Sequence, residues 1–158
     1  MTDTNVGTAA TAWATNPTTA ATTYGNIADW DTSAVSNMYQ LFYNKPTFNA
    51  DIGKWNVASV SNMQGMFGTA KAFIVNIGSW STARVTSMRD MFNRATAFNV
   101  NVGSWDTTRV INIAYMFYGA TAFNGNIASW NTASVSNMAG VRPLLFHVAF
   151  MCGVWAVL

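Results

Sequence analysis

The chain repeats itself every 25 residues, and this period constrains its fold more than any other feature. One tryptophan marks each repeat, without any insertion between repeats, at Trp30, Trp55, Trp80, Trp105 and Trp130. Isoleucine or valine stands three residues before each tryptophan, and valine stands five residues after it. The pattern covers residues 26–140 in about five repeats and predicts a stack of like units.

Two phenylalanines per repeat complete the apolar pattern. Together with the tryptophans they are predicted to form the structural core, and they stand at Phe42, Phe67, Phe92 and Phe117, and at Phe48, Phe73, Phe98 and Phe123. A single repeat buries too little apolar surface to offset the entropy lost on ordering 25 residues. Neighbouring repeats are therefore expected to share their apolar faces.

The local pattern of each repeat predicts one short helix and one short strand. Segment 61–67 spaces three apolar residues at i, i+3 and i+4, which is typical of a helix, and Ser61 stands where an N-cap belongs. In segment 52–57, the alternation of Trp55 and Val57 is typical of a strand. Columns of asparagine and aspartate between these segments predict turns at the corners of each coil.

The motif Phe-Asn-x-Asp-Ile-x-x-Trp-Asn-Val-x-x-Val-x-Asn-Met-x-x-Met-Phe at residues 48–67 resembles the BspA-like surface-protein repeat. That repeat also occurs in lipoprotein families of mycoplasmas and is grouped with the leucine-rich repeats. The resemblance covers residues 26–140 and implies a right-handed, leucine-rich-repeat-like α/β solenoid in a single stack. It also implies adhesion or protein–protein contact at a cell surface, and it brings no catalytic residues.

The two ends of the chain depart from the pattern. Residues 1–25 are rich in threonine and alanine and are expected to form a cap, a linker or a decayed coil. Residues 141–158 are apolar and fit either a sixth coil or an unrelated tail, for which we expect self-association. The apolar run is shorter than the roughly 20 residues that span a membrane, so membrane insertion is not favoured. No secretory signal is recognisable, which leaves the compartment open.

The composition disfavours catalysis, metal binding and cofactor binding. Glutamate is absent, and the chain has one histidine and one cysteine, His147 and Cys152, both in the apolar tail. A general base needs an orienting partner, and a zinc site needs several ligands. The net charge of +2 is too small to indicate nucleic acid as a partner. We therefore expect no enzyme activity, no metal site and no cofactor.

The remaining interpretation is a non-enzymatic repeat scaffold that binds a protein or a glycan. Four arginines form a candidate cationic contact patch, with solvated surface as the alternative: Arg84, Arg89, Arg94 and Arg109. The competing hypothesis is an ice- or crystal-ordering surface made by a threonine column, which Val57 interrupts between Thr32, Thr82, Thr107 and Thr132.

Overall fold

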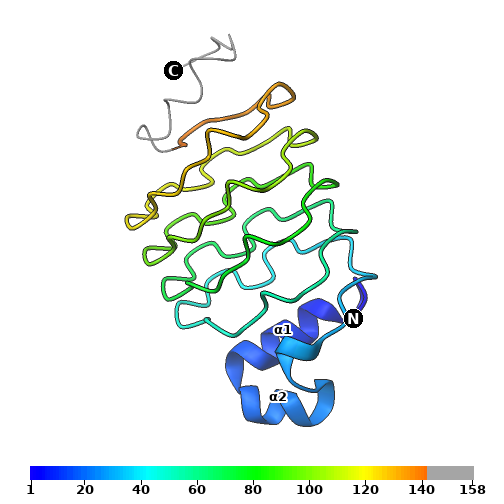
Figure 1. Ribbon diagram of the computed structural model, residues 1–158. Coiled ribbons are helices and arrows are strands. Elements are labelled where there is room, and N and C mark those ends of the chain that lie inside the picture. Colours follow the sequence, from blue (N-terminus) through cyan, green and yellow to red (C-terminus); the bar gives the residue numbers. More distant parts are fainter. Residues whose placement is uncertain (142–158) are drawn as a thin grey trace.

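The computed structural model describes residues 1–141, in which one coil lies upon the next above a helical N-terminal segment (Figure 1). We number the coils along the chain as coil 1 (26–50), coil 2 (51–75), coil 3 (76–100), coil 4 (101–125) and coil 5 (126–141). The predictions for His147, Cys152 and a sixth coil lie outside the described residues.

Parallel backbone hydrogen bonds join each coil to the next. One residue per coil forms an isolated parallel bridge, and these residues are Asn37, Asn62, Ser87, Asn112 and Asn137. Beyond the bridge, every second N–H donates to the next coil, as Met38 does to the carbonyl of Asn62 at 2.9 Å and Gln40 does to that of Gln64 at 2.9 Å.

The prediction of a right-handed, leucine-rich-repeat-like solenoid with one strand and one helix per coil is wrong. Within coils 1 to 5, the described residues contain no α-helix and no extended strand, only the short 3-10 helix η1 (Ile27–Asp29) and the isolated bridges. In the segment predicted to be a helix, the N–H of Met63 donates to the next coil, to the carbonyl of Ser87 at 3.0 Å. In the segment predicted to be a strand, the N–H of Trp55 closes a turn on the carbonyl of Ile52 at 3.1 Å.

Left-handed backbone positions interrupt the helical spacing. The φ angle is positive at Gly65 (65°) and at Thr69 (60°) in coil 2, and the equivalent positions in coils 1, 3 and 4 are also left-handed. A right-handed helix cannot continue through such residues. Ser61 therefore caps no helix, and its hydroxyl donates to the carbonyl of Ser36 in coil 1 at 3.3 Å.

The aromatic columns lie in the interior. The tryptophan and phenylalanine side chains that the repeat marks are all buried. The two phenylalanines of a coil stack face to face, as Phe67 does on Phe73 with ring centroids 4.0 Å apart. Each ring also stacks on its equivalent in the next coil, as Phe67 does on Phe92 at 5.6 Å. Continuous aromatic stacks therefore connect coils 1 to 4.

Three of the five repeat tryptophans donate their indole N–H to a carbonyl of the preceding coil. The distance is 2.8 Å from Trp55 Nε1 to the carbonyl of Ile27, and 3.1 Å from Trp105 Nε1 to that of Ile77. Trp80 Nε1 is buried without a hydrogen-bond partner. The tryptophans are thus equivalent in packing but not in hydrogen bonding.

This difference predicts unequal costs for the same substitution. Both Trp80→Phe and Trp105→Phe shrink a buried ring, but only Trp105→Phe also removes a hydrogen bond, while Trp80→Phe removes an unpaired donor. We expect Trp105→Phe to lower the free energy of unfolding by about 1–2 kcal/mol more than Trp80→Phe. Urea denaturation of both variants measures the difference, and equal losses would contradict it.

The threonine column is internal. Thr32, Thr82 and Thr107 are buried, and each hydroxyl donates at 2.9 Å to a backbone carbonyl of the next coil. These side chains cannot present a flat array to ice or to another crystal, so the competing hypothesis of an ordering surface loses its basis. Val57 occupies the same column in coil 2 and is also buried.

Completing the threonine column is expected to stabilise the protein. A Val57→Thr hydroxyl would meet the carbonyl of Ser81, which stands 24 residues further on, the offset that the other threonines use. We expect a gain of about 1 kcal/mol in the free energy of unfolding, and a loss of about 1–2 kcal/mol for the reverse change, Thr82→Val. Chemical denaturation tests both, and a destabilising Val57→Thr would show that the carbonyl is not within reach.

The first 25 residues close one end of the stack. Helix α1 (Val6–Thr15) and helix α2 (Pro17–Tyr24) lie beneath coil 1 (Figure 1). Val6 and Ala10 of α1 are buried in the same apolar cluster as the coils, and the ring of Trp13 meets that of Trp30 edge-on at 6.1 Å.

Before α1, Asp3 caps the polar edge of coil 1. Its carboxylate accepts the N–H of Ser36 at 2.7 Å, the hydroxyl of Ser36 at 2.6 Å and the N–H of Asn37 at 3.1 Å. In coil 2, Ser61 is equivalent to Ser36, and its N–H donates to a backbone carbonyl instead of a carboxylate. The Ser36 hydroxyl, followed by the two N–H groups, holds the pKa of Asp3 below its ordinary value.

Candidate functional site

One largely exposed stretch of each coil varies in size and charge while the interior beside it stays constant. It comprises four columns, which we call the variable face: Tyr39, Gln64, Arg89, Ala114 and Ala139; Gln40, Gly65, Asp90, Tyr115 and Gly140; Tyr43, Gly68, Asn93 and Tyr118; Asn44, Thr69, Arg94 and Gly119. The phenylalanines between these columns are buried in every coil from 1 to 4. The same scaffold therefore carries different surface chemistry at each level.

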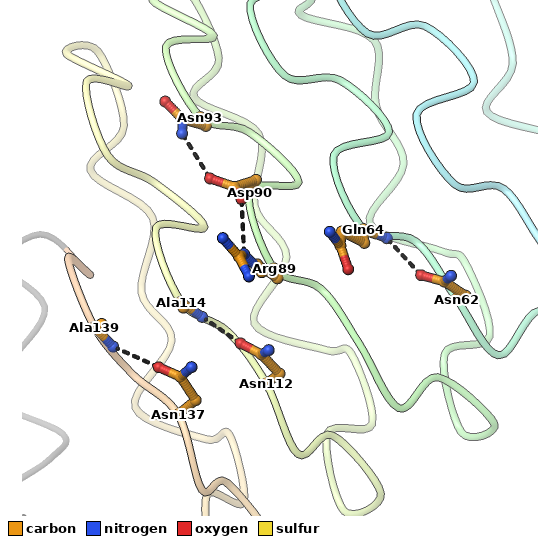
Figure 2. Close-up of polar contacts among 9 residues, drawn as sticks. All are labelled: Asn62, Gln64, Arg89, Asp90, Asn93, Asn112, Ala114, Asn137 and Ala139. Atoms are coloured by element: carbon orange, nitrogen blue, oxygen red, sulfur yellow. Dashed lines mark hydrogen bonds and ion pairs between the residues drawn. The ribbon is translucent and has the colours of Figure 1, made fainter.

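Asparagine side chains fix the backbone where the variable face begins. Asn62 Oδ1 accepts the N–H of Gln64 at 2.9 Å, and Asn112 Oδ1 accepts the N–H of Ala114 at 3.0 Å (Figure 2). Such turns hold the chain at the corner of the coil. The corner turns predicted for the asparagine columns are confirmed at these positions.

Tyrosines are gathered on this face. Of the 5 tyrosines in the chain, all except Tyr24 lie in the four columns. Tyr39, Tyr43, Tyr115 and Tyr118 are 39–49% exposed, whereas the phenylalanines and the repeat tryptophans are buried. Half-exposed tyrosines combine apolar area with a polar hydroxyl and are frequent in recognition surfaces.

The variable face is hollowed between its tyrosines. A depression of about 470 Å³ extends from Tyr43 in coil 1 to Tyr115 and Tyr118 in coil 4. Coil 2 contributes Gly65 to its lining, where the other coils from 1 to 4 have larger side chains. The volume falls within the roughly 300–1,000 Å³ of small-molecule sites.

Glycines of the next coil seat two of the tyrosine rings. A β-carbon placed on Gly68 would lie 2.7 Å from Cδ2 of Tyr43, and one placed on Gly140 would overlap the ring of Tyr115. The rings of Tyr43 and Tyr115 thus each lie against a glycine of the next coil, where a larger residue would have to displace the ring.

Between the tyrosines, Asp90 is paired twice. It accepts Arg89 Nε at 3.0 Å and Asn93 Nδ2 at 2.6 Å (Figure 2). Asn93 Oδ1 is buried without a hydrogen-bond partner. Arg89 with Asp90 is the only ion pair among residues 1–141, so the neighbouring Arg94 keeps an uncompensated charge in the hollow.

The structure divides the four arginines of the predicted patch. Arg89 and Arg94 line the hollow, whereas Arg84 and Arg109 are exposed outside it. Arg109 instead acts on Asp106, whose pKa is lowered first by the Thr108 hydroxyl, then by the Thr108 N–H, and also by the Arg109 charge. Only half of the predicted patch therefore belongs to the candidate site.

Sequence reasoning missed the tyrosines of this site. The columns that hold them differ from coil to coil, so they carry no repeat signal. The available signal was the contrast between phenylalanine at interior columns and tyrosine at adjacent variable columns. A tyrosine next to a column of buried phenylalanines indicates an aromatic ring whose hydroxyl reaches solvent.

The described residues offer no group of three or more histidine, cysteine, aspartate or glutamate side chains that could hold a metal ion. Within the same range, no helix is both long and apolar enough to cross a membrane.

Comparison with known families gives one match. The family model described as "Mycoplasma protein of unknown function, DUF285" matches residues 12–103 and, overlapping these, residues 58–143. Neither the curated proteins nor the solved structures contain a match. The two overlapping matches together take in the coils, the whole of α2 and the C-terminal end of α1.

Proposed function

The chain belongs to the DUF285 family of mycoplasma proteins, and from its variable face we propose that it is a non-enzymatic binding scaffold. Its partner is a protein or a glycan that contacts the variable face. The observation that carries the proposal is the hollow, in which half-exposed tyrosines and an arginine without an ion-pair partner among the described residues stand on a constant backbone.

The residue types of the hollow support this role. Tyrosine and arginine dominate binding energy in protein interfaces, because each offers a large contact area together with hydrogen bonds. Repeat stacks suit recognition because their columns form an extended and regular face. Changes at the exposed positions of such a face leave the stacked core untouched, so its specificity can change without loss of stability.

A position at the cell surface is part of the same proposal. The motif at residues 48–67 resembles the BspA-like surface repeat, and the family is one of mycoplasma proteins. The repeat resemblance supports a role in adhesion, in which the variable face contacts molecules outside the cell.

The test is binding of the labelled chain to arrays of extracellular-matrix proteins and of glycans. A triple variant, Tyr43→Ala with Arg94→Gln and Tyr118→Ala, removes the chemistry of the hollow. Its matched control, Arg84→Gln with Arg109→Gln, changes exposed arginines outside the hollow. We expect the triple variant to lose at least about tenfold in affinity and the control to be unchanged. Equal losses in both, or no binding to either array, would contradict the proposal.

A further inference from the structure

The lining of the hollow contains no aliphatic side chain. It is made of tyrosine, glutamine, asparagine, threonine, arginine, aspartate and one glycine. A peptide anchored by leucine or phenylalanine needs a desolvated apolar pocket, which this lining does not provide. The composition instead fits a ligand that is covered with hydroxyl groups and still has faces that can stack on aromatic rings.

The tyrosine rings stand far enough apart for an extended ligand. Tyr43 projects from coil 1 and Tyr118 from coil 4, which are three coil steps apart. At about 4.8 Å per step, this corresponds to a span of about 14 Å. A pyranose ring has a C–H face that packs on the electron-rich face of an aromatic ring. A short oligosaccharide can therefore contact the rings at both ends at once.

The polar groups between the rings select the sign of the ligand's charge. The carboxylate of Asp90 is already paired with Arg89 and Asn93, so it does not repel an anion as a free carboxylate would. Arg94 lines the same hollow without an ion-pair partner among the described residues. A guanidinium group binds a carboxylate or a sulfate through two parallel hydrogen bonds.

Asn93 adds an unused acceptor. Its Oδ1 is buried without a hydrogen-bond partner, and the residue lines the hollow. Buried polar atoms are normally paired with protein or with water, so this acceptor has capacity for one further donor. A sugar hydroxyl is a donor of this kind.

We propose that the hollow binds an acidic oligosaccharide, with sugar rings stacked on Tyr43 and Tyr118 and its carboxylate or sulfate held by Arg94. This inference rests on the proposed binding function and names the class of ligand for the same site. It requires that the tyrosines, Asn93 and Arg94 act on one ligand, rather than on separate parts of a protein surface.

The test is calorimetric titration of the full chain with three tetrasaccharides. Hyaluronan tetrasaccharide carries carboxylates only, chondroitin sulfate tetrasaccharide carries carboxylates and sulfates, and chitotetraose in its fully N-acetylated form is uncharged. We expect at least one acidic tetrasaccharide to bind about tenfold or more tighter than chitotetraose. Preference between the two acidic probes identifies the group that Arg94 holds.

Two matched substitutions locate the site. Arg94→Gln removes the charge from the hollow and is expected to weaken acidic binding by about tenfold to a hundredfold. Arg84→Gln removes an exposed charge outside the hollow and is expected to leave the affinity unchanged. Arg94→Lys keeps the charge and is expected to recover part of the affinity, which a merely structural role of Arg94 would not predict. Circular dichroism of each variant checks that the fold is intact.

The outcomes separate this inference from the proposed function. Equal affinity for acidic and neutral sugars, or equal losses in Arg94→Gln and Arg84→Gln, would overturn it. If no tetrasaccharide binds at millimolar concentration while a matrix protein binds and the triple variant loses it, the ligand class is wrong and the scaffold function stands. If neither sugar nor protein binds, both proposals fail.

Discussion

Phe92→Ala is expected to lower the free energy of unfolding by about 3–5 kcal/mol, the loss typical of a large aromatic side chain removed from a packed core. Phe92 is fully buried, and its ring stacks on Phe98 of the same coil at 3.8 Å. It also stacks on Phe67 and Phe117 of the adjacent coils, at 5.6 and 5.7 Å. The substitution therefore interrupts the aromatic stack in the middle of the array, on both sides at once.

Urea denaturation followed by tryptophan fluorescence measures this loss. Tyr118→Ala is the matched control, because it removes an aromatic ring from the next coil at a position that is 48% exposed. We expect the control to cost less than about 1 kcal/mol. A Phe92→Ala variant as stable as Tyr118→Ala would mean that the stacked rings do not hold the coils together.

The repeat columns could be predicted from the sequence because burial acts on each coil in the same way. Every coil meets a neighbour at the same positions, so Trp55 has equivalents in coils 1 to 5 and Phe67 has equivalents in coils 1 to 4. The asparagine corners were predictable for a related reason. A side chain such as Asn62 pairs with backbone only two residues away, so the interaction is encoded locally.

The helix and the strand could not be predicted correctly, because apolar spacing does not determine where the backbone N–H groups donate. Residues 63–67 have helical spacing, yet the N–H of Met63 and that of Phe67 donate to the next coil. A left-handed residue between them, Gly65, makes this possible. Glycine also stands at the equivalent left-handed position in coil 5, as Gly140, but coils 1, 3 and 4 have other residues there, which hid the signal.

The candidate site could be predicted in part. The cluster of arginines indicated a cationic surface, and Arg89 and Arg94 do line the hollow. The sequence spacing could not show that Arg84 lies outside the hollow, because the lining of the hollow is set by how the coils stack. The shape of the hollow depends on side chains that contact the next coil, as Tyr43 contacts Gly68. Such contacts join residues 25 apart in the sequence and exist only once the coils have stacked.

Ala10→Asp is expected to detach the N-terminal helices and make the chain associate. Ala10 is fully buried in the apolar cluster that joins α1 to the coils, so a carboxylate there would be buried without a partner. Leaving a charge unpaired in such a place costs several kcal/mol, which exceeds what two short helices gain from packing. Once α1 moves away, Trp30 loses the ring contacts with Trp13 and Tyr24 that cover it.

Exposed apolar surface and unpaired backbone at the end of a stack form a ready site for another copy of the chain, because the coils already join through parallel backbone hydrogen bonds. Terminal units of repeat proteins need a polar outer face for this reason. Sedimentation velocity should therefore show concentration-dependent oligomers for Ala10→Asp. Thr11→Asp, an exposed change in the next residue of α1, should show the same distribution as the unaltered chain. If Ala10→Asp sediments as Thr11→Asp does and is equally stable, the helices do not cap the stack, and Asp3 alone would have to protect the edge of coil 1 through its contacts with Ser36 and Asn37.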